Sequence, residues 1–211
     1  GITSIAPWRD QVAKAGLDEA VRIVKSNGIK LTGLCRGGFF PAANDADWQK
    51  NLDDNKRAID EAAAFSADCL VLVVGGLPGA SRDIVAARQM VFDGIAAVLP
   101  HAQASGVKLA IEPLHPMYAA DRSCVNTLGQ ALDMCEPLGE DVGVAIDVYH
   151  VWWDPRLAEA IARAGRERRI LAYHVCDWLV PTTDLLLDRG MMGDGVIELA
   201  AIRGEIESAG Y

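Results

Sequence analysis

Short, wholly apolar runs alternate along this chain with longer segments of helical period, and no other feature restricts its fold as much. The runs recur roughly every 27 to 39 residues, which is the length of one βα unit. Because they are apolar on both faces, they are typical of parallel strands that have helices on one side and a core on the other. We predict six strands, at residues 2–7, 30–35, 69–74, 107–111, 142–146 and 170–175.

The segments between these runs carry the apolar spacing of helices that pack by one face. Residues 17–24 and 84–98 each repeat apolar side chains at intervals of three and four, and Ser81 is placed to cap the second helix. Asp154 followed by Pro155 is typical of an N-cap and first helical position. These helices would be the crossovers that connect parallel strands.

Two architectures are compatible with this alternation, an open doubly wound sheet and an eight-stranded barrel. The glycine-rich turn at residues 75–79 follows the third strand and lacks the spacing of a dinucleotide-binding turn, which argues against the first. We therefore expect an α/β protein with a (β/α)8 TIM barrel, in which residues 1–211 form a single domain. Six units are fewer than a closed barrel needs, so we expect the chain to be truncated at both ends, lacking the first βα unit and the eighth strand.

Composition narrows the classes of partner. A formal net charge of −9 argues against a nucleic-acid partner, because binding a phosphate backbone requires a basic face. No apolar stretch is long enough to span a membrane. Five cysteines lie at no metal-type spacing, so we expect reduced thiols and a cytoplasmic protein. Association with further copies of the same chain, as a homo-oligomer, stays open.

Polar side chains that could bind a metal ion gather at the ends of three successive strands. Glu112 follows the strand at residues 107–111, Asp147 and His150 follow the next, and His174 lies at the end of the one after. The carboxyl ends of barrel strands converge on one mouth, and a buried carboxylate is costly unless it is paired or bound to metal. Glu112, Asp147 and His174 would form a mixed oxygen and nitrogen shell for a divalent ion. Mn²⁺ is the favoured ion, with Co²⁺, Zn²⁺ or Mg²⁺ as alternatives.

Four segments together resemble the sugar phosphate isomerase/epimerase family, whose members have a xylose-isomerase-like barrel and include inosose isomerases and ketose 3-epimerases. The resemblance covers nearly the whole chain and depends on residues 111–114, 146–150, 174–177 and 189–197.

The resemblance implies that Glu112, Asp147 and His174 are three of four metal ligands. It also implies that His150 contacts a substrate oxygen and that Arg189 binds the oxygens or phosphate of the substrate. The fourth family ligand is a glutamate on the eighth strand, and no position here matches it. Ketose epimerases of the family also carry a second glutamate a few residues after the first ligand, where this chain has no acidic residue.

Further side chains are candidates for substrate contact. Trp152 could form an apolar wall for a sugar face. Arg9 and Arg36 each follow or end a predicted strand and could bind an anionic substrate. Asp177 is placed to orient a ligand histidine, and His101 is expected in solvent.

Taken together, these residues predict a metal-dependent enzyme that isomerises or epimerises a small sugar, sugar phosphate or inosose. The metal would polarise a carbonyl, and Glu112, with His150 at the substrate, would move a proton through an enediolate. Two alternatives remain at this stage. One is a metal-dependent hydrolase of the apurinic-endonuclease-like barrel type, and the other is a barrel that binds a sugar without catalysis.

Overall fold

A parallel sheet of five strands in the order β3-β4-β5-β6-β7 forms the centre of the computed structural model, which describes residues 1–211. A parallel pair, β1 with β2, and an antiparallel pair, β8 with β9, lie beside it. The strands are Ser4–Ile5 (β1), Lys30–Leu31 (β2), Leu34–Gly38 (β3), Cys69–Val73 (β4), Lys108–Ile111 (β5), Val142–Asp147 (β6), Ile170–His174 (β7), Asp177–Trp178 (β8) and Arg189–Gly190 (β9).

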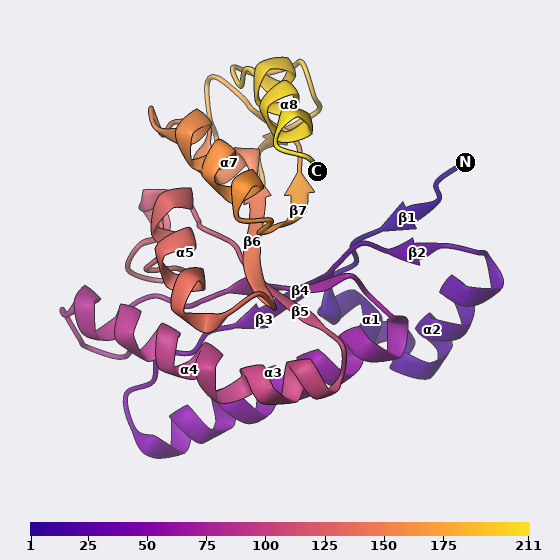
Figure 1. Cartoon of the computed structure of the whole chain (residues 1–211), viewed down its shortest axis with the longest axis vertical. Coiled ribbons are helices and arrows are strands. Elements are labelled where there is room, and N and C mark those ends of the chain that lie inside the picture. Colours follow the sequence, from indigo (N-terminus) through magenta and orange to yellow (C-terminus); the bar gives the residue numbers. More distant parts are fainter.

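Helices connect the strands and lie along the outer face of the sheet (Figure 1). The two longest helices, α3 and α4, pack side by side below β3, β4 and β5, and α7 packs against α8 near β6 and β7 (Figure 1). The helices are Arg9–Ala15 (α1), Leu17–Ser26 (α2), Asp45–Phe65 (α3), Ile84–Ala104 (α4), Leu128–Cys135 (α5), Val148–Val151 (α6), Leu157–Arg166 (α7) and Leu199–Ser208 (α8), with short 3-10 helices at Pro116–Tyr118 and Glu136–Leu138.

Each of the six predicted runs contains a strand, and the alternation of strands with helices is confirmed. One run differs, because residues 30–35 are divided into β2 and β3 with a break at Thr32 and Gly33. The backbone N–H groups at positions 30, 32 and 35 donate in turn to the carbonyls at positions 3, 5 and 7. The run therefore keeps the first strand as its neighbour throughout, and one extra residue between Thr32 and Cys35 interrupts the ladder, which an apolar pattern does not reveal.

A glycine allows β3 to lie close to β4. Gly38 has a φ of 109°, and a Cβ added there would lie 1.9 Å from the carbonyl oxygen of Val73. Any side chain would therefore force the two strands apart.

Two predicted helix starts need correction. Asp83 rather than Ser81 caps α4, because its Oδ1 accepts from two backbone N–H groups of the first turn, at 3.0 and 2.9 Å. The next start lies further along the chain than expected. Asp154 accepts from the N–H of Arg156 and holds a turn, and α7 begins at Leu157.

The core has two layers on the two faces of the sheet. A cluster of 41 buried residues fills the space between the sheet and the helices. On the inner face, a second cluster contains only small or medium side chains: Cys35, Cys69, Val71, Ala110, Ala145 and Ala172. This inner layer forms the floor below the carboxyl ends of the strands.

No helix in the structure combines the length and the apolar character that crossing a membrane requires.

Candidate functional site

Strand geometry brings Glu112, Asp147 and His174 together, and we call these three residues the strand-end cluster. Successive side chains of a strand alternate between its faces, so each lies two positions beyond an alanine of the inner layer and faces the same way. Asp147 and His174 are also direct partners in the register of β6 and β7. One potential ligand atom from each of the three residues lies within 4.8 Å of the other two. The expected convergence at the mouth is therefore present.

Within this cluster, Glu112 faces His174. Glu112 Oε1 lies 3.4 Å from Nδ1 of His174, and the glutamate side chain is 7% exposed. Its carboxylate raises the pKa of His174 against the opposing effect of burial. The histidine therefore compensates part of a negative charge that has little access to water.

Asp147 has a structural contact and a charged contact. Its Oδ1 accepts from the backbone N–H of Tyr149 at 3.0 Å, which caps the short helix α6. Its Oδ2 accepts from Nη1 of Arg189 at 2.8 Å. The cap fixes the orientation of the carboxylate with respect to the strand.

Arg189 reaches the cluster from β9 and is held on several sides. Its guanidinium lies 4.3 Å from the ring centre of Tyr149, and Nη2 lies 3.1 Å from Nε2 of His150. Burial works against its charge, but the carboxylate of Asp147 outweighs this effect and raises the pKa of Arg189. Arg189 therefore stays cationic beside the strand-end cluster.

His150 is a buried, neutral imidazole. Burial lowers its pKa, and the Arg189 guanidinium acts in the same direction against the nearby carboxylates. Its Nδ1 lies 3.3 Å from the backbone N–H of His115. A neutral imidazole accepts at one nitrogen only, and a second ring proton would place both ring N–H groups against the donors of His115 and Arg189, which is unfavourable.

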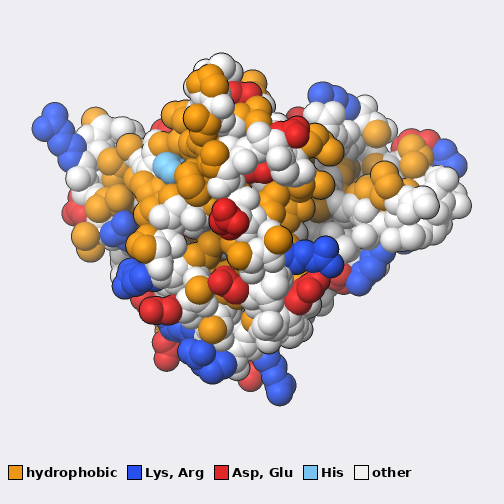
Figure 2. Space-filling view, turned by 90° about the horizontal axis from the view of Figure 1, so that it is seen from above, with side chains coloured by type: hydrophobic (Ala, Val, Ile, Leu, Met, Phe, Trp, Pro, Cys, Tyr) orange, Lys and Arg blue, Asp and Glu red, His pale blue; other side chains and the backbone are white.

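A segment of residues 179–192, which we call the roof segment, covers the mouth and carries Arg189. The hydroxyls of Tyr118 and Tyr149 both donate to the carbonyl of Leu185, at 2.9 and 3.0 Å. Several large apolar side chains around this segment are exposed, among them Leu187 at 79% and Met191 at 68%. In the view of the molecule from above, hydrophobic side chains gather with acidic side chains among them, and basic side chains lie mostly toward the edges (Figure 2).

Below the roof segment lies a cavity of about 220 Å³, which we call the mouth cavity. This volume suits a small ligand. The cavity is lined by the strand-end cluster and by Ala6, Trp8, Cys35, Arg36, Val73, Leu114, Tyr118, Arg122, His150, Leu186 and Arg189.

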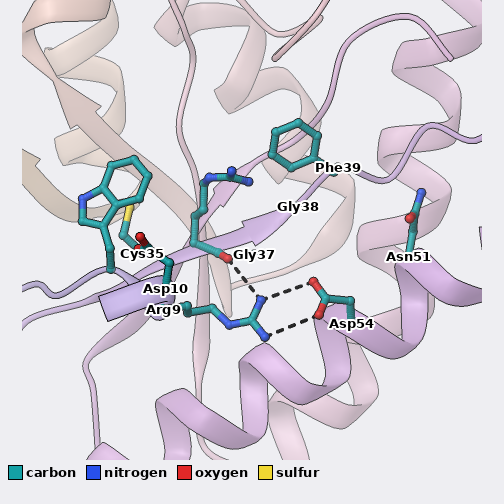
Figure 3. Close-up of a pocket in the computed structure, with 10 residues that line it drawn as sticks. Arg9, Asp10, Cys35, Gly37, Gly38, Phe39, Asn51 and Asp54 are labelled. Carbon is teal, nitrogen blue, oxygen red and sulfur yellow. Dashed lines mark hydrogen bonds and ion pairs between the residues drawn. The ribbon is translucent and has the colours of Figure 1, made fainter. Parts of the chain in front are cut away.

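A second hollow, the side cavity, lies between α1, β3 and α3 (Figure 3). Its volume is about 460 Å³, and Trp8, Cys35 and Arg36 line both cavities. Arg9 crosses its floor and is bonded to two acids. Its Nε lies 2.7 Å from Glu61 Oε2. Its Nη1 lies 3.2 Å from Asp54 Oδ2 (Figure 3).

Three of the sequence candidates occupy other positions than expected, whereas His101 is partly exposed, in agreement with the expectation. Trp152 does not line the mouth cavity, because it packs against the ring of Trp178 with 5.6 Å between centroids. Arg9 forms ion pairs in the side cavity. Asp177 accepts backbone N–H groups, including those of Gly193 and Ile197, and so holds a loop instead of orienting a histidine. His101 Nε2 lies 2.7 Å from a carboxylate oxygen of Asp60.

The sequence reasoning also missed several residues that line the mouth cavity. Trp8 directly follows the first predicted strand, so the same strand-end argument could have found it. Tyr118 and Arg122 lie in the irregular stretch after β5, and Leu186 lies in the roof segment. Neither stretch has a periodic pattern, so no sequence signal pointed to these three.

Comparison with protein families gave one match over the whole chain. The family model described as "Xylose isomerase-like TIM barrel" matches residues 1–211. A sequence search against curated proteins returned no match.

Comparison with solved structures gave many similar chains. The crystal structure of protein SMc04130 from Sinorhizobium meliloti 1021 is 73% identical with a TM-score of 0.98, and the alignment covers 100% of this chain and 77% of that one. The IolI protein with a bound zinc atom is 19% identical with a TM-score of 0.77, covering 99% and 76%. The 3-keto-D-glucoside 4-epimerase YcjR from E. coli is 18% identical with a TM-score of 0.78, covering 100% and 79%. At such low identity, the last two likenesses show a shared fold.

Proposed function

The chain belongs to the xylose isomerase-like TIM barrel family, and on this premise we propose that it is a divalent-metal-dependent isomerase or epimerase of a small sugar or polyol-derived carbonyl compound. The observation that carries the proposal is the strand-end cluster, in which two buried carboxylates and one imidazole converge within 4.8 Å. Buried carboxylates are costly unless they are paired or coordinated. The donor set therefore fits a divalent ion.

Glu112, Asp147 and His174 would hold the ion. Two oxygens and one nitrogen suit Mn²⁺ best, with Co²⁺, Zn²⁺ and Mg²⁺ as alternatives. The zinc atom described for the IolI structure, which shares the fold, is consistent with a metal at this kind of site. When bound, such an ion polarises a carbonyl and stabilises negative charge that develops on its oxygen.

The residues of the chain supply the proton transfer and the positioning. We assign Glu112 the role of moving the proton next to the carbonyl, because its carboxylate lies in the mouth cavity. Neutral His150 would contact a substrate oxygen, and Arg189 would stabilise negative charge on the substrate, since it stays cationic at the same wall. The roof segment would exclude water from the reacting atoms.

The hydrolase alternative has less support from the side chains present. A site of several metal ions needs further histidines or acids, and the structure brings together a single group of three such residues. Arg36 and Gly75 directly follow the second and third predicted strands, at the places where extra histidines would be required. The alternative of a non-catalytic binding barrel is separated from ours by a direct test of proton exchange.

That test measures deuterium uptake from D₂O into a panel of ketoses, inososes and hydroxypyruvate, by mass spectrometry. The protein is used after EDTA treatment and again after reloading with Mn²⁺. We expect deuterium at the carbon next to the carbonyl of at least one compound, only with the reloaded protein. Binding of a panel compound without any exchange would favour the non-catalytic barrel and overturn the proposal.

A further inference from the structure

The mouth cavity has an unusual balance of charge for so acidic a protein. The whole chain has a formal net charge of −9, yet three arginines line this cavity against two carboxylates. A divalent ion on the strand-end cluster would add further positive charge. Concave sites with low-dielectric walls concentrate such a field, so the cavity favours an anionic ligand.

Two of these arginines have no close carboxylate to compensate their charge. Arg189 is bonded to Asp147, but no carboxylate lies within 4.0 Å of the Arg36 guanidinium. The acid nearest to Arg122 is its exposed neighbour Asp121, with 4.0 Å between Nε and Oδ2, and so distant a surface contact contributes little. Arg36, which lines both cavities, and Arg122 therefore have their hydrogen-bond donors free for a ligand.

Aromatic rings hold both guanidinium groups in place. Arg36 lies over Phe39 at 4.4 Å from the ring centre, and Arg122 lies 5.6 Å from the ring centre of Tyr118. Phe39 stands at the wall of the side cavity (Figure 3), and its φ of 53° is uncommon for a bulky residue. Stacking orients a guanidinium without consuming its N–H donors, which remain available.

The backbone around both residues is also fixed before any ligand arrives. Arg36 lies within β3, which pairs with β4 on both sides of this position. The carbonyl of Arg122 accepts from the N–H of Gly75 at 2.9 Å, and its own N–H donates to the carbonyl of Tyr118 at 3.0 Å. A preorganised pair of donors loses little entropy on binding.

The two like charges also act on each other. Burial lowers the pKa of Arg36, and the positive charge of Arg122 acts in the same direction. A guanidinium nevertheless keeps its charge in proteins. An anion between the two groups would relieve this repulsion.

Building on the proposed function, we propose that the substrate is an anionic sugar derivative whose carboxylate or phosphate group is bound by Arg36 and Arg122. Guanidinium groups match both anions with pairs of parallel hydrogen bonds. The strand-end cluster, His150 and Arg189 would then act on the carbonyl end of the same molecule.

Three six-carbon polyols test this directly: glucitol, gluconate with a carboxylate at C1, and glucitol 6-phosphate with a phosphate at C6. None has an aldehyde or ketone group, so none can react, and their binding is measured by isothermal titration calorimetry in EDTA and again with Mn²⁺. We expect at least one of the two anions to bind about tenfold or more tightly than glucitol in both conditions. Comparing gluconate with glucitol 6-phosphate tells which anion the site takes.

Substitution of each arginine tests whether the preference for an anion depends on Arg36 and Arg122. Arg36→Met and Arg122→Met should each weaken binding of the preferred anion about tenfold or more and leave glucitol unchanged. Arg22→Met, on the exposed face of α2, removes the same charge far from the cavity and should have no effect. Arg36→Lys should retain part of the affinity, and thermal melting checks that every variant is folded.

Equal binding of all three polyols, or an anion preference that survives in both Met variants, would overturn the inference. Failure of the proposed function would give a different pattern of results. If neutral carbonyl compounds exchange deuterium and anionic ones do not, the function stands and the inference fails. If anions bind through Arg36 and Arg122 but no carbonyl compound exchanges, the inference about the ligand stands and the function fails.

Discussion

The mouth cavity and the side cavity contain the same kinds of charged side chain in different states. In the side cavity, Arg9 is bonded to Glu61 and Asp54, and its Nη1 also lies 3.5 Å from the carbonyl of Arg36. The Glu61 carboxylate raises the pKa of Arg9 above its ordinary value. In the mouth cavity, Glu112 faces a single histidine at 3.4 Å and two arginines face no close acid. Charges that satisfy each other stabilise a fold, whereas charges left without partners in a cavity are available to a ligand.

Position in the sequence did not separate these two cases. Arg9 and Arg36 both follow a predicted strand closely, and both were equal candidates for an anionic substrate. What separates them is the helix α3, which places two acids against Arg9 and none against Arg36. The comparison predicts that equivalent substitutions in the two cavities have different consequences.

The largest expected difference is between Glu112→Gln and Glu61→Gln. Glu112→Gln keeps the size and one oxygen but removes the base, so turnover should fall about 10²–10⁴-fold while bound metal largely remains. Glu61→Gln removes one negative charge from the side cavity and should leave turnover near that of the parent. Steady-state rates, or deuterium uptake into the substrate found in the panel, provide the measurement.

Two results would contradict the expected difference between these two variants. If Glu112→Gln retains its metal and turns over at the parent rate, Glu112 is a ligand only. An equal loss of turnover in both variants would show that the side cavity takes part in the reaction.

The next difference concerns stability and its response to metal. Arg9→Met leaves two partly buried acids without their partner and should lower the free energy of unfolding by about 2 kcal/mol, allowing for solvent exposure. Arg189→Met leaves Asp147 unpaired and should cost a similar amount in EDTA. Adding Mn²⁺ should reduce the loss of unfolding free energy caused by Arg189→Met, because the ion compensates the same carboxylate. It should not change the loss caused by Arg9→Met.

Urea unfolding of parent and both variants, with EDTA and with Mn²⁺, measures these four differences. If Arg189→Met lowers the free energy of unfolding by the same amount in EDTA and in Mn²⁺, the ion does not bind at Asp147.

A smaller effect tests the burial of a thiol, Cys135, whose pKa is shifted mainly by loss of water contact. Burial raises the pKa of the Cys135 thiol to about 12, against an ordinary value near 9. Above pH 9 the unfolded chain loses this proton while the folded chain keeps it, so stability falls as pH rises between about 9 and 12. From pH 9 to 10, the parent should lose up to about 1.4 kcal/mol more than Cys135→Ala does. Parallel slopes for the two proteins in urea unfolding would contradict this.

Much of the fold could be predicted because apolar patterning is local information. Runs such as residues 69–74 are apolar on both faces, and β4 lies there with every residue buried. The strand-end cluster was predictable for a related reason, since alternation along a strand determines which face a side chain occupies. The break between β2 and β3 was not predictable, because it depends on one extra residue in the hydrogen-bond register against the first strand.

The rest of the candidate site depends on contacts between distant segments. Arg122 reaches the mouth cavity through an irregular stretch after β5, and its placement depends on a hydrogen bond from Gly75 to its carbonyl. Trp152 follows His150 closely in sequence but packs on Trp178 instead of lining the cavity. Proximity along the chain is therefore a weak guide to the cavity wall outside the strands.

The central claim is that the strand-end cluster holds one divalent ion, and elemental analysis of protein purified without chelator tests it most directly. The account predicts about one equivalent of a divalent metal per chain in the parent and in the side-cavity control Asp54→Asn. It predicts only traces in the double variant Asp147→Asn with His174→Ala, which removes two of the three potential ligand groups. Trace metal in the parent after incubation with Mn²⁺, or full metal content in the double variant, would contradict it.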